Sequence, residues 1–362
     1  MPIKVLVVDD SVVMRRVLSE LINGEEGLEV VGAAENAQQA REEIKRLNPD
    51  VLTLDVNMPG MDGIEFLDRL MRLRPMPVVM VSSFTAEGSD TTLRALEAGA
   101  VDFIGKPRLS DPVAMREYAE ELGEKIRGAK LASVRRSAPQ PAVSRLASAP
   151  PVMPTPVSPP VKGAAGDAVS SASRIIYLGA STGGTEAIKV FLQGIPANSA
   201  PILIVQHMPE MFTASFAKRL DGLSAATVIE AQGGEVIKRG MVYIAPGHSH
   251  MTVRRSGAGL VTELHKTPPV NRHRPSVDVL FDSAVEVSGR NAVGVLLTGM
   301  GKDGAEGLLR MRKAGAPTFA QDEASCVVFG MPREAIVRGG ADEVVPLDKM
   351  AGRVLATLGG GR

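Results

Sequence analysis

Short apolar runs that alternate with amphipathic stretches predict an α/β fold, and this rhythm occurs on both sides of a proline-rich segment. The chain has 362 residues, which at about 150 residues per domain is enough for two domains. Apolar residues make up 44% of it, so each domain has enough of them to bury a core. We therefore expect two α/β domains joined by a linker.

The first domain is predicted over residues 1–128. Its expected strands are apolar runs at Lys4–Val8, Val30–Ala34, Val51–Leu54, Val78–Val81 and Val101–Ile104. Between them lie stretches with helical spacing, such as Ser11–Ile22 and Ala37–Leu47. Five β/α units favour a doubly wound, flavodoxin-like parallel sheet, in which ligands bind at the carboxyl ends of the strands.

The middle segment, residues 129–172, is dense in Pro, Ala and Ser and contains no aromatic residue. Such a composition cannot bury enough apolar surface to offset the entropy of ordering the chain. We interpret it as a flexible linker that proline partly stiffens. The alternative is a motif that binds a partner.

The second domain is predicted over residues 173–362, with a mostly parallel sheet. The same rhythm returns there, with strands expected at Arg174–Leu178, Pro201–Gln206, Met241–Ala245, Ala292–Leu297 and Thr318–Ala320. Helical stretches include Thr185–Gln193, Met211–Leu220, Ser276–Val287 and Asp303–Lys313. The Gly-rich, alternating pattern over Thr227–Glu263 indicates antiparallel strands or a hairpin that interrupts the sheet.

Charge divides the chain although its formal net charge is zero. Residues 1–130 hold 16 basic and 23 acidic residues, whereas residues 174–362 hold 21 and 17. Domains of opposite net charge are expected to have separate roles and to attract each other when docked. The single cysteine, Cys326, excludes an internal disulfide. The acidic N-terminus and the lack of a long apolar run predict a cytoplasmic protein without membrane insertion.

Acidic residues follow two of the predicted strands of the first domain. Asp9 and Asp10 end the first strand and Asp55 ends the third, so their carboxylates should meet at one sheet edge and repel one another unless a hard cation such as Mg²⁺ is bound. Ser82 and Lys106 follow the next two strands, where a hydroxyl and an ammonium could bind a phosphoryl group on Asp55. Taken singly, each of these residues could be a helix cap or a surface residue.

Four motifs in residues 1–125 resemble the receiver domain of two-component response regulators: VLVVDDS, TLDVNMPGMDG, PVVMVSS and AVDFIGKP. The resemblance implies that Asp55 accepts the phosphoryl group and that Asp10, with Asp9 beside it, holds Mg²⁺. It further implies that the Asn57 carbonyl completes the metal site. By the same resemblance, Ser82 and Phe103 are the switch residues and Lys106 contacts the phosphoryl group.

Ser181 lies in a Gly-rich turn, Gly179-Ala180-Ser181-Thr182-Gly183-Gly184, between a predicted strand and a helix. This order fits G-x-S-x-G, in which glycines allow a sharp turn and the helix N-terminus offers N–H groups to an oxyanion. Turns of this kind also bind phosphate, or connect a strand to a helix without binding a ligand. A Walker A loop is excluded, because no Lys-Ser/Thr pair follows at the required spacing.

His207 and Asp303 follow two further predicted strands. Three parallel strand ends can converge at one edge, so Ser181, His207 and Asp303 can form a nucleophile, a general base and the acid that orients it. The chain order differs from that of α/β-hydrolases. Alternatively, His207 is a hydrogen-bonded loop histidine and Asp303 a helix cap, and His248 and His250 give a weak zinc signal.

Motifs across residues 173–358 resemble the catalytic domain of chemotaxis protein-glutamate methylesterases, the CheB family: GASTGG, IVQHM, YIAPG, NRHRPSVDVLF, LLTGMGKDGAEG and VVFGMPREA. The resemblance implies Ser181 as nucleophile, His207 as base and Asp303 as its orienter, with backbone N–H groups near Thr182 and Met300 as oxyanion donors. It implies hydrolysis of γ-glutamyl methyl esters on chemoreceptors, with release of methanol and without a cofactor. Deamidation of receptor glutamines is implied as well.

The same resemblance implies that a histidine kinase phosphorylates Asp55 and that the unphosphorylated receiver covers the catalytic cleft. Two alternatives belong to other classes of protein. A DNA-binding output is disfavoured because the second domain has no basic helix, so no nucleic-acid partner is expected. A pseudoenzyme that only docks on receptors is disfavoured because all three candidate catalytic residues are present.

Overall fold

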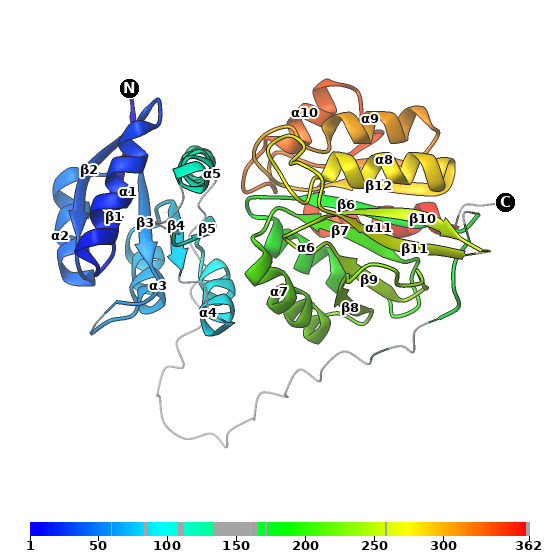
Figure 1. Cartoon of the computed structure of the whole chain (residues 1–362), viewed down its shortest axis with the longest axis horizontal. Helices are drawn as coiled ribbons and strands as arrows, with labels where there is room; N and C mark the ends of the chain where they lie inside the picture. Colours follow the sequence, from blue (N-terminus) through cyan, green and yellow to red (C-terminus); the bar gives the residue numbers. More distant parts are fainter. Residues whose placement is uncertain are drawn as a thin grey trace, which may run out of the picture.

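The computed structural model describes residues 1–58, 60–82, 86–107, 112–132, 162, 166–170, 172–257 and 259–359. Two α/β domains lie side by side (Figure 1). Most of the predicted linker, 129–172, lies outside the described residues, although a helix continues to Leu131. Near the other end of this range, Val169 is buried on the second domain, and its N–H donates to the Ile237 carbonyl at 3.0 Å.

The first domain is a five-stranded parallel sheet of order β2-β1-β3-β4-β5, which confirms the flavodoxin-like prediction. Its strands are β1 (Ile3–Val8), β2 (Leu28–Ala34), β3 (Val51–Asp55), β4 (Val78–Ser82) and β5 (Asp102–Gly105). Its helices are α1 (Val12–Gly24), α2 (Ala37–Leu47), α3 (Gly63–Leu73), α4 (Ala86–Glu97) and α5 (Pro112–Leu131).

Successive side chains along each strand point to opposite faces of the sheet, so the core of this domain is divided into two layers. In β1, Leu6 and Val8 pack under α2, α3 and α4, whereas Val5 and Val7 pack under α1 and α5. Polar side chains begin three of the helices: Ser11, Asn36 and Asp62 each accept a hydrogen bond from a backbone N–H three residues on.

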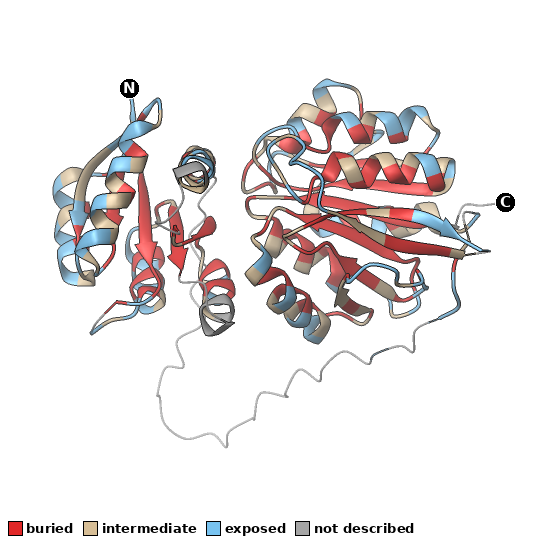
Figure 2. Cartoon of the chain, viewed as in Figure 1, coloured by how far each residue is buried: buried red, intermediate tan, exposed pale blue. Residues whose placement is uncertain are grey.

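The second domain has a seven-stranded parallel sheet of order β14-β13-β12-β6-β7-β9-β8. In chain order the strands are β6 (Ile175–Ala180), β7 (Ile202–Gln206), β8 (Thr227–Glu230), β9 (Met241–Ile244), β12 (Ala292–Leu296), β13 (Thr318–Gln321) and β14 (Glu343–Val345). The helices are α6 (Gly184–Gln193), α7 (Glu210–Leu223), α8 (Val277–Val287), η1 (Gly289–Asn291), α9 (Ala305–Lys313), α10 (Met331–Val337) and α11 (Leu347–Gly359). Most residues of both parallel sheets are buried (Figure 2).

The predicted hairpin is present, but it forms a sheet of its own. Strands β10 (His250–Ser256) and β11 (Gly259–His265) pair antiparallel with each other. They do not interrupt the main sheet, because β8 and β9 join that sheet as parallel strands. The chain passes from β6 to β7 on one side and reaches β12 on the other. The carboxyl end of β6 is therefore the switch point at which α/β sheets bind ligands.

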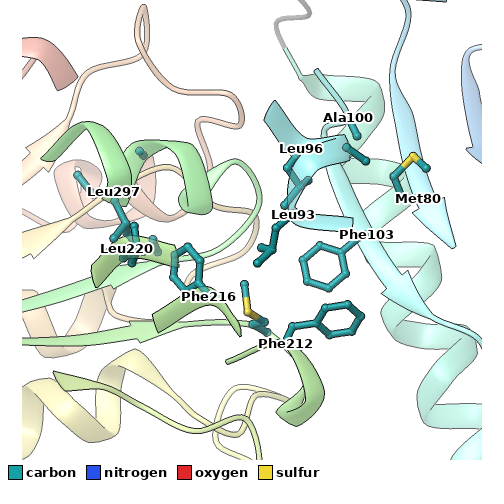
Figure 3. Packing of buried hydrophobic residues seen from close by; sticks show 14 of the residues in the cluster. Met80, Leu93, Leu96, Ala100, Phe103, Phe212, Phe216, Leu220 and Leu297 are labelled. Atoms are coloured by element: carbon teal, nitrogen blue, oxygen red, sulfur yellow. The ribbon is translucent and has the colours of Figure 1, made fainter. Parts of the chain in front are cut away.

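The domains share one apolar cluster, formed where α4 packs against α6 and α7. Phe103 of β5 meets Phe212 of α7 edge to face, with ring centroids 4.5 Å apart. Leu93 and Leu96 of α4 lie opposite Phe216 of α7 (Figure 3). Such an aromatic pair contributes about 0.5–1.5 kcal/mol beyond the area it buries. Phe103, which the sequence predicts to be a switch residue, therefore lies in the contact between the two domains.

Candidate functional site

Three carboxylates gather at the carboxyl edge of the first sheet. Asp9 and Asp10 follow β1, and Asp55 ends the neighbouring β3. One oxygen of each lies within 4.8 Å of the others, and only Asp10 is exposed. Like charges this close repel one another, and carboxylate oxygens are the ligands that Mg²⁺ prefers. The donor set therefore fits a Mg²⁺ ion.

Lys106, which follows β5, contacts two of these carboxylates. Its Nζ is 2.8 Å from Asp55 Oδ2 and 2.9 Å from Asp9 Oδ2. Burial raises the pKa of Asp55 even though Lys106 opposes it. Burial alone would lower the pKa of Lys106, but its two carboxylate partners raise it above the usual range. Lys106 thus contacts two of the three carboxylates, which together outnumber this lysine.

The other receiver residues predicted from the sequence lie around Asp55. The Asn57 N–H donates to Asp55 Oδ1 at 3.3 Å. Ser82 is buried at the end of β4, and its carbonyl accepts from the Lys106 N–H at 2.8 Å. Phe103 is buried against the second domain. The structure brings these residues together, and their roles as metal ligand and switch stay predictions.

Ser181 lies on the tight turn between β6 and α6. Gly183 has a φ of +75°, and a Cβ at Gly184 would lie 2.1 Å from Gln206 Oε1, so both positions require glycine. The Ser181 N–H donates to the Thr298 carbonyl at 3.0 Å, and its carbonyl accepts from Gln206 Nε2 at 2.9 Å. Groups that follow β12 and end β7 therefore hold the turn from both sides.

His207 follows β7 and Asp303 lies in the loop after β12, the two strands that flank β6. His207 Nε2 is 2.8 Å from Asp303 Oδ2, and both side chains are buried. His207 Nδ1 has no hydrogen-bond partner within the described part of the chain. His207 and Ser181 line one cavity. The nitrogen not bound to Asp303 is thus free to act as a base.

The carboxylate of Asp303 accepts five hydrogen bonds. The donors are His207 Nε2 (2.8 Å), Asn271 Nδ2 (2.8 Å), Ser276 Oγ (2.7 Å), Val277 N (2.6 Å) and Asp278 N (3.3 Å). Burial alone would raise the pKa of Asp303, but these donors, above all His207, hold it well below the usual range. Asp303 therefore stays ionised and immobile.

The helix-cap alternative for Asp303 is wrong for the helix that follows it. The N-cap of α9 is Gly304, and no side chain caps that end. Asp303 instead accepts the first N–H groups of α8, from Val277 and Asp278. The positive end of α8 thereby adds to the stabilisation of the carboxylate.

Thr182 and Met300, the predicted oxyanion donors, line the same cavity as Ser181. Across the described ranges, the backbone N–H of neither residue donates a hydrogen bond to another group. Free N–H groups beside a nucleophile can stabilise an oxyanion. Their assignment stays a prediction.

Sequence reasoning missed His273 and Asn271, although the motif NRHRPSVDVLF contains both. The His273 ring stacks on His207, with centroids 3.7 Å apart and planes 17° apart. Burial, helped by the nearby His207, lowers the pKa of His273 to about 2. His273 is therefore neutral. It can pack against the His207 ring without adding a second positive charge when His207 takes up a proton.

The histidines that suggested zinc are engaged in hydrogen bonds. His250 Nδ1 accepts from the Ser276 N–H, and its Nε2 lies near the Pro268 carbonyl, both at 3.1 Å. His248 Nδ1 is 2.6 Å from Ser249 Oγ. His250 therefore helps to position Ser276, one of the donors to Asp303.

A cavity of about 700 Å³ lies between the domains, with Ser181 and His207 on one wall and α5 on the other. Thr182 Oγ1 donates to Asp102 Oδ2 of β5 at 2.6 Å, and both groups are buried. A Cβ at Gly128 of α5 would lie 3.0 Å from Met300 Sδ. The first domain thus contacts Thr182 and Met300, the two predicted oxyanion donors.

Among the described residues, three ion pairs cross between the domains, and in each the first domain supplies the acid. Glu97 pairs with Lys189 at 3.2 Å and also with Arg219, and Glu124 pairs with Arg272 at 2.9 Å. Burial alone would raise the pKa of Glu97, but its two basic partners lower it. This arrangement agrees with the opposite net charges of the two domains.

The structure defines a receiver domain docked on an α/β domain that carries a Ser, His and Asp cluster. Residues 176–354 match the family model of the CheB methylesterase, and residues 5–117 match that of the response regulator receiver domain. None of the helices in the described part of the chain is long and apolar enough to cross a membrane.

Relatives match nearly the whole chain. A protein-glutamate methylesterase/protein-glutamine glutaminase 1 of Dechloromonas aromatica is 64% identical over 99% of each chain. A protein of the same name, numbered 2, from Cupriavidus pinatubonensis is 58% identical over 98% of this chain and 96% of its own. The Thermotoga maritima CheB methylesterase catalytic domain is 41% identical, with a TM-score of 0.50 over 51% of this chain and 98% of its own. The chain belongs to the CheB methylesterase family.

Proposed function

We propose that this chain is a phosphorylation-activated protein-glutamate methylesterase and protein-glutamine glutaminase that serves adaptation in chemotaxis. The family and the names of full-length relatives support this activity. One observation carries it: His207, which is 2.8 Å from Asp303, shares a cavity with Ser181 at the end of the central strand. A DNA-binding output is disfavoured because the second domain matches the methylesterase model.

In the first half-reaction, Ser181 Oγ attacks the carbonyl carbon of a glutamyl γ-methyl ester. His207 takes the serine proton through Nδ1, because Nε2 is bound to Asp303. Asp303 holds the ring and stabilises the imidazolium. The N–H groups of Thr182 and Met300 stabilise the oxyanion. The intermediate collapses as His207 returns the proton to the departing methanol, which leaves an acyl-serine.

In the second half-reaction, His207 takes a proton from water, which attacks the acyl-serine. Collapse of this second intermediate releases the glutamate carboxylate and returns the proton to Ser181 Oγ. The glutaminase reaction follows the same route, with ammonia as the leaving group. Nitrogen must be protonated before it leaves, so protonation by His207 matters more in that reaction.

The receiver couples this chemistry to a histidine kinase. Asp55 is the group to which the phosphoryl is transferred, and Lys106 lies beside it to contact the transferred group. Asp9, Asp10, Asp55 and the Asn57 carbonyl would hold Mg²⁺, which supplies positive charge that offsets the charge of the phosphoryl group. The docked state restricts access to Ser181, because Asp102 of β5 is hydrogen-bonded to Thr182 and Gly128 of α5 lies against Met300. A phosphorylated receiver that repacks Ser82 and Phe103 would undock.

The substrate is proposed to be the methylated cytoplasmic helices of chemoreceptors, and the protein would act in the cytoplasm. The test is methanol release from membranes that carry methylated receptors, with phosphodonor present. The wild-type chain should release methanol, and Ser181→Ala should release almost none. Wild-type turnover by Ser181→Ala would disprove the assignment of the nucleophile.

A further inference from the structure

Charge is divided between the two walls of the interdomain cavity. On the wall formed by the second domain, the charged or titratable lining residues are Arg272, Arg274, His207 and His273, and none of the described lining residues there is acidic. The acidic residues among the described lining residues all belong to α5 of the receiver: Glu117, Glu120, Glu121 and Glu124. Lys106 and Lys125 also line the receiver wall, where acidic residues outnumber basic ones. A catalytic wall of this kind favours a negatively charged partner.

Arg272 lies at the tip of a two-residue turn over the cavity. Val270 and His273 exchange backbone hydrogen bonds of 3.1 and 2.9 Å, and the two residues between them have φ values of +52° and +67°. Positive φ at both central residues is typical of a tight hairpin turn. Arg272 is exposed, and its contact across the cavity is the ion pair with Glu124.

The same turn is anchored in the catalytic machinery. Asn271 donates to Asp303 at 2.8 Å and to Asp278 at 2.7 Å. His273 stacks on His207. The position of Arg272 relative to the base and its orienter is therefore set by its two immediate neighbours in the chain.

Helix α5 indicates which kind of partner can bind to the cavity wall formed by the second domain. Its glutamates at 117, 120, 121 and 124 follow a helical spacing that puts them on one face, and that face lines the cavity. One turn beyond Glu124, Gly128 lies against Met300 and Thr182, where an added Cβ would be 3.0 Å from Met300 Sδ and 3.8 Å from Thr182 Oγ1. A helix with an acidic face thus lies across the predicted oxyanion residues, with a carboxylate on Arg272 four residues away, about 6 Å along its axis.

We infer that Arg272 binds a carboxylate on the substrate helix, one turn from the glutamate being hydrolysed, and that Glu124 occupies this position in the docked chain. The inference rests on the proposed function and deepens it. Undocking of the receiver would free Arg272 for the receptor helix. In the docked chain, the acidic face of α5 therefore occupies the position of the substrate helix. The receiver and the receptor compete for Arg272.

The test compares variants of the full chain, all with phosphodonor, on two substrates. One is membranes with methylated receptors, and the other is p-nitrophenyl acetate, a small ester without a carboxylate. For Arg272→Glu, the ratio of kcat/KM on receptors to that on the small ester should fall about tenfold, chiefly through KM. Arg272→Lys should retain most of the wild-type ratio, because it keeps the charge.

Arg290→Glu is the matched control. Arg290 is exposed in η1, which precedes β12 and so lies at the opposite edge of the sheet from Ser181. The Arg290→Glu variant makes the same change in net charge as Arg272→Glu. It should keep the wild-type ratio of kcat/KM on receptors to that on the small ester. An Arg272→Glu chain with a wild-type ratio would overturn the inference while leaving the esterase intact. A wild-type chain that releases no methanol would instead overturn the proposed function.

A reciprocal charge swap separates docking from substrate binding. Without phosphodonor, Arg272→Glu should raise the rate on the small ester, because Glu124 loses its partner. Adding Glu124→Lys should lower that rate again, since the opposite charges are restored. The double variant should still show the lowered receptor ratio. Recovery of the receptor ratio in the double variant would show that Arg272 acts only on the receiver.

Discussion

Asp55 of the receiver and Asp303 of the catalytic domain are both buried, yet their surroundings are opposite. Asp303 accepts five hydrogen bonds, and its pKa is held below the usual range. Asp55 contacts Lys106 and one backbone N–H, lies near two further carboxylates, and has a raised pKa. The carboxylate that we propose to orient a base accepts many hydrogen bonds. The carboxylate that we propose to accept the phosphoryl group accepts few.

The largest effect is expected from Asp303→Asn. The change keeps the shape of the side chain but removes the charge that stabilises the His207 imidazolium, and the amide can impose the wrong ring tautomer. We expect kcat for methanol release to fall about 10⁴-fold, with KM little changed. Steady-state methanol release with phosphodonor measures this loss. A loss smaller than about tenfold would mean that Asp303 is not the orienter.

A smaller effect is expected from Asn271→Ala, which removes one of the five donors. Without it kcat should fall about tenfold. The pKa of Asp303 should rise toward its usual range, which NMR titration of its carboxyl carbon measures. Asn198→Ala, at an exposed asparagine of the same domain, is the control. A purely structural role for Asn271 would lower the rate without raising the pKa of Asp303.

The two aspartates should also affect the free energy of unfolding in opposite directions. The lowered pKa of Asp303 contributes stability that is present above the unfolded-state value of about 3.9 and is lost as the pH falls through the folded-state value. The raised pKa of Asp55 has the reverse sign: its favourable contribution exists at low pH and is lost as the pH rises through the folded-state value. Because pH 7 lies above the unfolded-state pKa of both groups, Asp303 stabilises the fold there and Asp55 destabilises it.

We therefore expect Asp303→Asn to lower the free energy of unfolding by about 2–3 kcal/mol and Asp55→Asn to raise it by about 1 kcal/mol at pH 7. Lys106 keeps Asp9 as a partner when Asp55 is replaced. Urea titration without Mg²⁺, followed by circular dichroism because the chain has no tryptophan, measures both. Changes of the same sign would contradict the comparison.

The strand ends could be predicted from the sequence, because parallel strands bring their carboxyl ends to one edge. That rule was enough to group Asp9, Asp10 and Asp55, and to bring Ser181 together with His207 and Asp303. The donors to Asp303 could not be found in this way. Asn271 and Ser276 reach it only because the 270–276 segment folds over the end of the sheet from a distant part of the chain.

The contacts between the docked domains could not be predicted from local sequence patterns, for the same reason. The charge split predicted attraction between the domains, but it did not identify Glu97 or Glu124 as the acids. The hydrogen bond from Thr182 to Asp102 joins residues 80 positions apart. Neither composition nor periodicity predicts such a pair, because it depends on how the surfaces of the two folded domains pack against each other.

The most direct test measures methanol release from methylated receptors with and without phosphodonor, in the wild type, Asp55→Asn and Asp303→Asn. The account predicts that phosphodonor activates the wild type. Asp55→Asn should keep the unstimulated rate and lose the response, and Asp303→Asn should lose both. An Asp55→Asn chain that still responds to phosphodonor, or an Asp303→Asn chain with normal turnover, would contradict the division between a reacting and an orienting aspartate.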